Sequence, residues 1–125
     1  MAKTDAVQEF IKTAKETNGV HAVTVVEIES GMALGTFSTG KLDPEVASAY
    51  NVEVVKAKLK AIEALGLKET IDDILITLTS QYHLINCTEN GAHMIYLAAD
   101  KDKSNLAILR SIVRKGSESI KAQLS

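Results

Sequence analysis

The sequence has no tryptophan, one cysteine and one proline, and aromatic residues make up only 4% of its 125 residues. A single cysteine excludes an intramolecular disulfide, so we expect a reducing, cytoplasmic environment. The net charge of −2 lacks the concentrated basic surface that nucleic-acid binding needs, and we expect no nucleic-acid partner. No stretch has the length of a signal peptide or a membrane span, so we expect no membrane insertion. The 46% hydrophobic content is typical of one globular domain spanning residues 1–125.

Hydrophobic periodicity and turn residues predict eight elements, in the order helix, two strands, helix, three strands, helix. Thr4 or Asp5 is a candidate cap for the first helix, and Asp43-Pro44-Glu45 has the pattern of a helix start. Ser30-Gly31 and Asn90-Gly91 are predicted hairpin turns. The predicted ranges are a helix ending at Asn18-Gly19, strands 20–28 and 32–38, a helix from 43 to about 65, strands 71–79, 82–88 and 92–99, and a helix from Ser104 or Asn105 onward.

The predicted strands indicate an α+β sandwich with a five-stranded, mostly antiparallel sheet. Three of the strands are apolar on both faces, which is typical of a sheet that helices cover on both sides. Short hairpin connections between successive strands favour antiparallel pairing. The strand at 71–79 needs a neighbour on one side, and a long apolar edge invites pairing with a second copy of the chain. The strand order is not fixed by these patterns.

The central helix carries two separate apolar stripes. Advancing about 100° per residue from Val46 places a wide stripe within roughly 100° and a narrow stripe at roughly 160–240°. We expect the wide stripe to cover the sheet of its own chain, whereas the spacing of the narrow stripe is typical of a helix–helix seam. The wide stripe consists of Val46, Ala47, Tyr50, Val54, Ala57, Ala61, Ala64 and Leu65, and the narrow stripe of Val52, Val55, Leu59 and Ile62.

Because one sheet cannot cover faces about 150° apart, the narrow stripe needs another cover. A second helix of the same chain is one alternative, but the other two helices are needed on the opposite face of the sheet. A second copy of the chain is the interpretation that we favour, since each such side chain gains about 1.5–3 kcal/mol on full burial. The predicted homodimer interface therefore consists of Val52, Val55, Leu59 and Ile62.

Residues 35–42 nearly match the phosphate-binding pattern GxxxxGK[ST]. Leu42 stands where a hydroxyl should hold magnesium, and Gly35 is predicted inside a strand rather than after one. Asp43 then places a carboxylate where phosphate would bind. We therefore expect the end of a strand and a loop here, without nucleotide hydrolysis.

His83, Cys87 and His93 do not form a predicted metal or thiol site. Along one extended strand the Cα atoms of His83 and Cys87 are about 13 Å apart, whereas zinc ligands lie within about 4 Å of one another. If Asn90-Gly91 is the turn, His93 points to the opposite face of the sheet. We therefore interpret the three residues as core or surface side chains.

The chain has only two arginines, Arg110 and Arg114, both on the predicted final helix. An arginine acting on a partner's nucleotide could come only from that helix, and a solvated helix face is the alternative that we favour. Nucleophile elbows, HExxH, CxxC and dinucleotide fingerprints are absent. We therefore expect a protein that is not an enzyme, with no catalytic residue, cofactor or metal.

Three segments carry a resemblance to a known family. They are residues 19–27 (GVHAVTVVE) followed by Ser30-Gly31, the long helix after Asp43-Pro44-Glu45, and residues 105–110 (NLAILR). In the predicted order of elements, the chain resembles the roadblock family, the dynein light chain type 7 relatives, over nearly its whole length. The resemblance implies a roadblock/profilin-like sandwich without enzymatic activity. The acidic Glu27 and Glu29 depart from the family pattern and leave the particular partner open.

The same resemblance implies homodimers or heterodimers in which two sheets join edge to edge and the long helices pair. Family members serve as platforms or regulators of Ras-like small GTPases, or as adaptors on dynein and membrane-signalling complexes. Prokaryotic single-domain members are often linked to gliding or polarity GTPases, and this compact chain is similar to those. We therefore expect a homodimeric scaffold or regulator of a Ras-like small GTPase. The alternative is a small-ligand sensor, which needs polar groups converging in an apolar cavity, and Thr24, Thr77 and Asn86 are its candidates.

Overall fold

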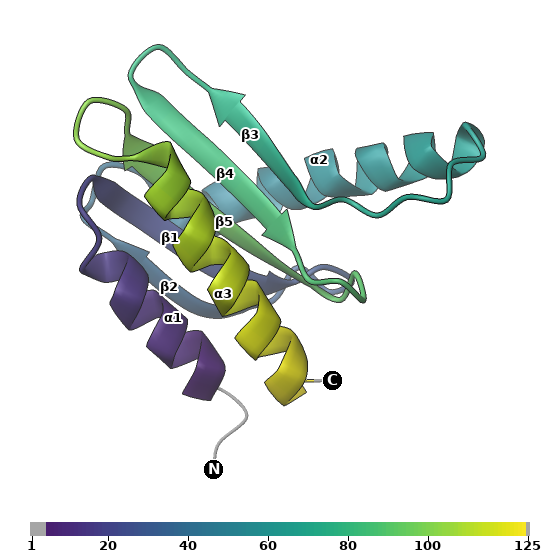
Figure 1. The fold of residues 1–125 in the computed structure, drawn as a ribbon, viewed down its shortest axis with the longest axis horizontal. Coiled ribbons are helices and arrows are strands. Elements are labelled where there is room, and N and C mark those ends of the chain that lie inside the picture. The colour runs from purple at the N-terminus through teal and green to yellow at the C-terminus, as the bar shows by residue number, and fades with distance from the viewer. Residues whose placement is uncertain (1–4, 125) are drawn as a thin grey trace.

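The computed structural model describes residues 5–124, and these form helices and strands in the predicted order (Figure 1). Of the two candidate caps for the first helix, Thr4 lies outside the described residues and Asp5 is the first helical residue. The elements are α1 (Asp5–Lys15), β1 (Val20–Glu27), β2 (Ala33–Ser38), α2 (Pro44–Ala64), β3 (Asp73–Thr77), β4 (Gln81–Cys87), β5 (His93–Asp100) and α3 (Leu106–Leu124).

The five strands form one antiparallel sheet in the order β2-β1-β5-β4-β3. The antiparallel α+β architecture is thus confirmed, and the structure adds the strand order that the sequence pattern leaves open. β1 and β5 lie at the centre, and nearly all of their side chains are buried. β3 is an edge strand, as the hydrophobic pattern at 71–79 indicates.

Helices cover both faces of the sheet. α1 and α3 pack side by side on one face, and α2 lies on the other (Figure 1). The apolar face predicted for the first helix is buried, because Val7, Phe10, Ile11 and Ala14 all belong to the core beneath α1 and α3. A second, smaller core lies between α2 and the opposite face of the sheet, and it includes Val26, Ile85 and Tyr96 among others.

Local hydrogen bonds explain where α2 begins and ends. Asp43 Oδ1 accepts from the backbone N–H of Glu45 (2.9 Å) and of Val46 (3.3 Å), which caps the N-terminus as predicted. At the other end, Gly66 has a φ of 69°, a conformation that favours glycine. The N–H of Leu67 then donates to the carbonyl of Ile62 (3.1 Å) and closes the last turn.

The two predicted hairpin turns differ in outcome. Around Asn90-Gly91 the predicted register is confirmed, since Cys87 lies opposite Met94 on β5. Around Ser30-Gly31 the two-residue turn is wrong, because β1 ends at Glu27 and β2 begins only at Ala33. The wider loop is held by the Ser30 hydroxyl, which donates to Glu27 Oε1 at 2.6 Å.

Candidate interaction surface

The most exposed apolar surface of the described chain is the wide stripe of α2. Tyr50 is 75% exposed and Leu65 69%, followed by Val46 at 53% and Val54 at 41%. Between them lie Ala57 and Ala64, which are also exposed. A cluster of large exposed apolar side chains on one helix face is typical of an interaction surface.

The narrow stripe instead faces the sheet of its own chain in the first half of α2. Val52 is 3% exposed and Val55 is fully buried, and both belong to the core between α2 and the sheet. Ser48, one turn earlier on the same face, is also buried, at 2%. The prediction that the lone chain leaves Val52 and Val55 uncovered is therefore wrong, and so is the assignment of the wide stripe to the sheet.

The reversal has a physical reason in the size of the side chains and in Ser48. The wide stripe has more members, but four of its eight are alanines, each of which offers little apolar area for burial, and another is Tyr50, whose hydroxyl end favours contact with water. The sheet-facing side begins with Ser48, a polar residue that a count of apolar residues omits. Its hydroxyl donates to the carbonyl of Glu45 (3.1 Å), so it is buried with its hydrogen bond satisfied.

The second half of α2 has little support from its own chain. Within the described residues, no α2 side chain after Val55 is fully buried. Leu59 is 39% exposed and Ile62 is half-buried, so their part in an interface stays a prediction. In Figure 1 the C-terminal turns of α2 project past β3. Because most helical stability in proteins comes from packing of an apolar face, this half of the helix gains most from a partner.

The edge strand β3 is the second unpartnered feature. Within residues 5–124, β3 pairs only with β4, which leaves its outer backbone groups without a strand partner. Ile74 and Ile76 point to the same face of the sheet as α2 and stay half-exposed. The side chain of Asp73, on the other face, accepts from Arg110 Nε at 3.1 Å. An edge of this kind is able to pair with another strand.

Both arginines are engaged with carboxylates of their own chain. Arg110 contacts Asp73, and Arg114 Nη2 lies 3.5 Å from Asp72 Oδ2. The two guanidinium groups are about half exposed, so the pairs add little to stability. This arrangement supports the interpretation of a solvated face of α3 rather than a catalytic arginine.

The segment resembling a phosphate loop has no phosphate-binding geometry. Gly35 lies within β2 against Val7 of α1, and Lys41 Nζ is bound to the carboxylate of Asp100 at 2.9 and 3.0 Å. A side chain on Gly35 would overlap Val7, which accounts for the glycine without any ligand. The interpretation as the end of a strand and a loop is confirmed.

Histidine and cysteine side chains do not gather into a site. His83 and Cys87 lie on the α2 side of the sheet, whereas His93 points to the other side, as the predicted register requires. Burial raises the pKa of the Cys87 thiol to about 11, which disfavours the reactive thiolate. Among the described residues no three histidine, cysteine or acidic side chains are placed to hold a metal, and no described helix is long and apolar enough to cross a membrane.

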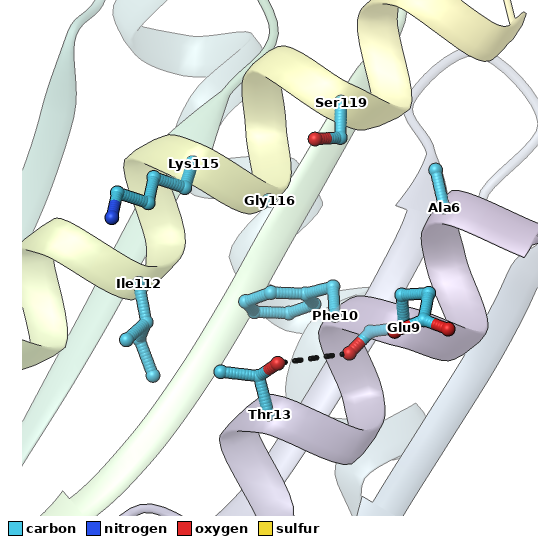
Figure 2. Close-up of a pocket in the computed structure, with 8 residues that line it drawn as sticks. All are labelled: Ala6, Glu9, Phe10, Thr13, Ile112, Lys115, Gly116 and Ser119. Carbon is cyan, nitrogen blue, oxygen red and sulfur yellow. Dashed lines mark hydrogen bonds between the residues drawn. The ribbon is translucent and has the colours of Figure 1, made fainter.

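A groove of about 170 Å³ lies between α1 and α3 (Figure 2). Its floor is the ring of Phe10, which lies against Gly116, where any added Cβ would overlap the ring. Thr13 turns its hydroxyl to the carbonyl of Glu9 (3.1 Å) instead of into the groove. The groove therefore reflects the close packing of two helices around the ring of Phe10.

The polar residues considered for a ligand sensor also fail to converge. Thr24 faces α2 and donates to the carbonyl of Pro44 at 2.9 Å, so its hydroxyl is used within the fold. Asn86 lies on the opposite face, beside Ser117 of α3, and Thr77 is exposed on the edge strand. The geometry gives the sensor interpretation no specific support.

No family model and no curated protein sequence matches the chain. Among solved structures, it is similar to a Roadblock/LC7 domain from Streptomyces avermitilis, with a TM-score of 0.77, 12% identity, and 93% of this chain and 95% of that chain covered. It is also similar to the gliding protein MglB from Thermus thermophilus, with a TM-score of 0.80, 11% identity, and 98% and 91% covered. For MglB from Myxococcus xanthus the TM-score is 0.74, with 13% identity and 94% and 90% covered. The chain therefore has the Roadblock/LC7 fold that the sequence resemblance implies.

Proposed function

We propose that this chain is a homodimeric, non-enzymatic scaffold or regulator of a Ras-like small GTPase. The observation that carries the proposal is the exposed wide stripe on a helix whose second half lacks support from its own chain. Exposure of such an apolar surface to water is unfavourable in free energy, and its burial against a protein partner is favourable.

A second copy of the chain is the occupant that we propose for the wide stripe. In a two-fold dimer the same patch meets itself, so an apolar stripe is complementary to its own copy without a second specialised surface. The alanines at 57, 61 and 64 let two helices approach closely, while Tyr50 and Leu65 supply large apolar area on either side of them.

The free edge of β3 supports the same dimer. If the outer edge of β3 pairs with the β3 of a second copy, two five-stranded sheets become one continuous sheet. The half-exposed side chains of Ile74 and Ile76 then lie near the centre of the assembly, on the face that carries α2. Two members of the narrow stripe, Leu59 and Ile62, lie on the projecting half of α2 and remain able to contribute to this dimer interface.

The GTPase partner follows from the fold together with the family resemblance. A solved structure with the same fold is a protein named for gliding, and prokaryotic members of the family that the sequence resembles are often linked to gliding or polarity GTPases. No set of nucleophile, base and acid converges among the described residues, which favours action through surface contact.

The test is binding of the purified chain to the Ras-like GTPases of its source organism. Each GTPase is loaded with GDP or with a non-hydrolysable GTP analogue and titrated by calorimetry, with GTP hydrolysis measured in parallel. The proposal predicts binding to at least one GTPase that differs between the two nucleotide states. Absence of binding to every GTPase in both states contradicts it, whatever the oligomeric state of the chain.

A further inference from the structure

A buried imidazole at the start of β1 has no hydrogen-bond partner for its ring. His21 lies where the register between β1 and β5 shifts, between Val20 and Ala22, and only 3% of the residue is exposed. Within the described structure, neither Nδ1 nor Nε2 of His21 makes a hydrogen bond of ordinary geometry, and its polar neighbours are the carboxylate of Asp100, 3.9 Å from Nε2, and the side chain of Gln81. Buried polar atoms are nearly always satisfied in folded proteins, so this ring is an exception that needs a reason.

A second imidazole lies near it and is fully engaged. The Nε2 of His83 is 2.8 Å from Gln81 Oε1, and its Nδ1 is 3.2 Å from the hydroxyl of Tyr96. Because an amide oxygen only accepts, Nε2 carries the proton and Nδ1 accepts from the tyrosine. His83 is therefore held in its neutral form, and a second proton would cost it the bond from Tyr96.

The loop that leads into α2 is attached to the sheet at the same place. The backbone N–H and the hydroxyl of Thr39 both donate to the carbonyl of His21, at 2.9 and 3.3 Å. Lys41, two residues on, binds the carboxylate of Asp100. Residues 39–43 are thus attached to the sheet through the backbone of His21 and the side chain of Asp100, and also through Ser38 of β2, whose hydroxyl donates to the carbonyl of Leu42 at 2.8 Å.

Three charged or titratable groups face the ring of His21, each from a different element. Asp100 at the end of β5 has Oδ1 3.9 Å from His21 Nε2, Lys41 comes from the loop, and His83 lies on β4. Burial lowers the pKa of His21 below its ordinary 6.5, an effect that Asp100 and Gln81 oppose and Lys41 reinforces. Burial, and secondarily the nearby His21, lowers the pKa of His83.

We propose that protonation of His21 releases residues 39–43 from the sheet and loosens the N-terminus of α2 in weakly acidic solution. An added proton turns both ring nitrogens into donors, and the nearest carboxylate is that of Asp100. The imidazolium then competes with Lys41 for this carboxylate and repels the lysine at the same time. The anchor at Asp100 gives way first, and the remaining bonds of Thr39 to His21 and of Leu42 to Ser38 then open more often.

The direction of the pH effect follows from linkage. When residues 39–43 are released, or the chain is unfolded, His21 takes up a proton near pH 6.5. In the closed state the buried ring does so only at lower pH. Between these two values the released state binds more protons, so a fall in pH favours release. The equilibrium between closed and released states shifts by up to about tenfold per pH unit for each histidine involved.

Hydrogen exchange of backbone amides tests the proposal directly. The informative amides are those of Thr39, bonded to His21, and of Ala47, bonded to Asp43, with β5 amides at the sheet centre as the reference. Between about pH 7.5 and pH 5.5, after correction for intrinsic rates, we expect the protection of both to fall about fivefold or more relative to the reference. Equal protection at both pH values would overturn the proposal.

Two variants make the test specific. In His21→Gln the pH dependence of Thr39 and Ala47 disappears, and its persistence contradicts the proposal. Lys41→Met removes the anchor at Asp100 without touching the buried ring, so the protection of Thr39 and Ala47 at pH 7.5, corrected for intrinsic rates, should fall to the wild-type value at pH 5.5. Wild-type protection in this variant at pH 7.5 also contradicts the proposal, so the proposal stays testable even if His21→Gln does not fold.

Hydrogen exchange reports on bonds within one chain. Failure of this test is therefore distinct from the absence of a dimer or of a GTPase partner.

Discussion

Truncation of Tyr50 to alanine tests the proposed use of the wide stripe. A tyrosine carries about 150–250 Å² of surface, and 75% of Tyr50 is exposed, so up to about 110–190 Å² per copy is available to an interface. At about 25 cal/mol per Å² this amounts to at most about 3–5 kcal/mol per copy. Because Tyr50 occurs twice in a symmetric dimer, the substitution removes this contribution to the free energy of association twice.

Only part of this upper limit is realised, because association has its own entropic costs. If a third is realised at both copies, about 2–3.3 kcal/mol in total, Tyr50→Ala raises the dimer dissociation constant by about 30- to 250-fold. Sedimentation equilibrium over a range of concentrations measures the constant, and Glu118→Ala, at an exposed position of α3 on the other face of the sheet, is the control. Alanine is a good helix former, so circular dichroism should show an intact fold. An unchanged constant in Tyr50→Ala, or an equal change in Glu118→Ala, would refute the reasoning.

The remaining predictions concern the fold and the cysteine. Val55→Ala removes a fully buried side chain and should lower the free energy of unfolding by about 1.5–3 kcal/mol in urea titrations; an unchanged midpoint would place Val55 outside the core. Asp43→Ala removes the cap of α2 and should cost about 1 kcal/mol by the same measurement, with Glu45→Ala as a control that spares the cap. Because the pKa of Cys87 is raised to about 11, its alkylation at pH 8 should be at least tenfold slower than that of free cysteine, and equal rates would contradict the burial.

Much of the fold was predictable because its signals are local. The cap at Asp43, the glycine after α2 and the register around Asn90-Gly91 each depend on a few neighbouring residues. The strand order and the bulge at His21 depend instead on contacts between residues far apart in sequence. The nearness of His21, His83 and Asp100 therefore had no signal in the sequence pattern.

The central helix shows where reasoning from periodicity fails. Two apolar stripes were correctly expected on α2, but periodicity alone does not say which one meets the sheet. The decisive residues were Ser48, whose satisfied hydroxyl allows burial, and Tyr50, whose polar tip tolerates water. A helix that is apolar on two faces still indicates a partner, and the structure moves the main candidate surface from the narrow stripe to the wide one.

The proposed dimer is tested most directly by isotope-filtered NOE spectra of a mixture of labelled and unlabelled chains. Such spectra report only contacts between different molecules. The proposal predicts intermolecular NOEs between the ring of Tyr50 in one chain and methyl groups of the wide stripe, such as Val54 and Ala61, in the other. Intermolecular NOEs that bypass the wide stripe, or a chain that sediments at 13.4 kDa at every concentration, would contradict it.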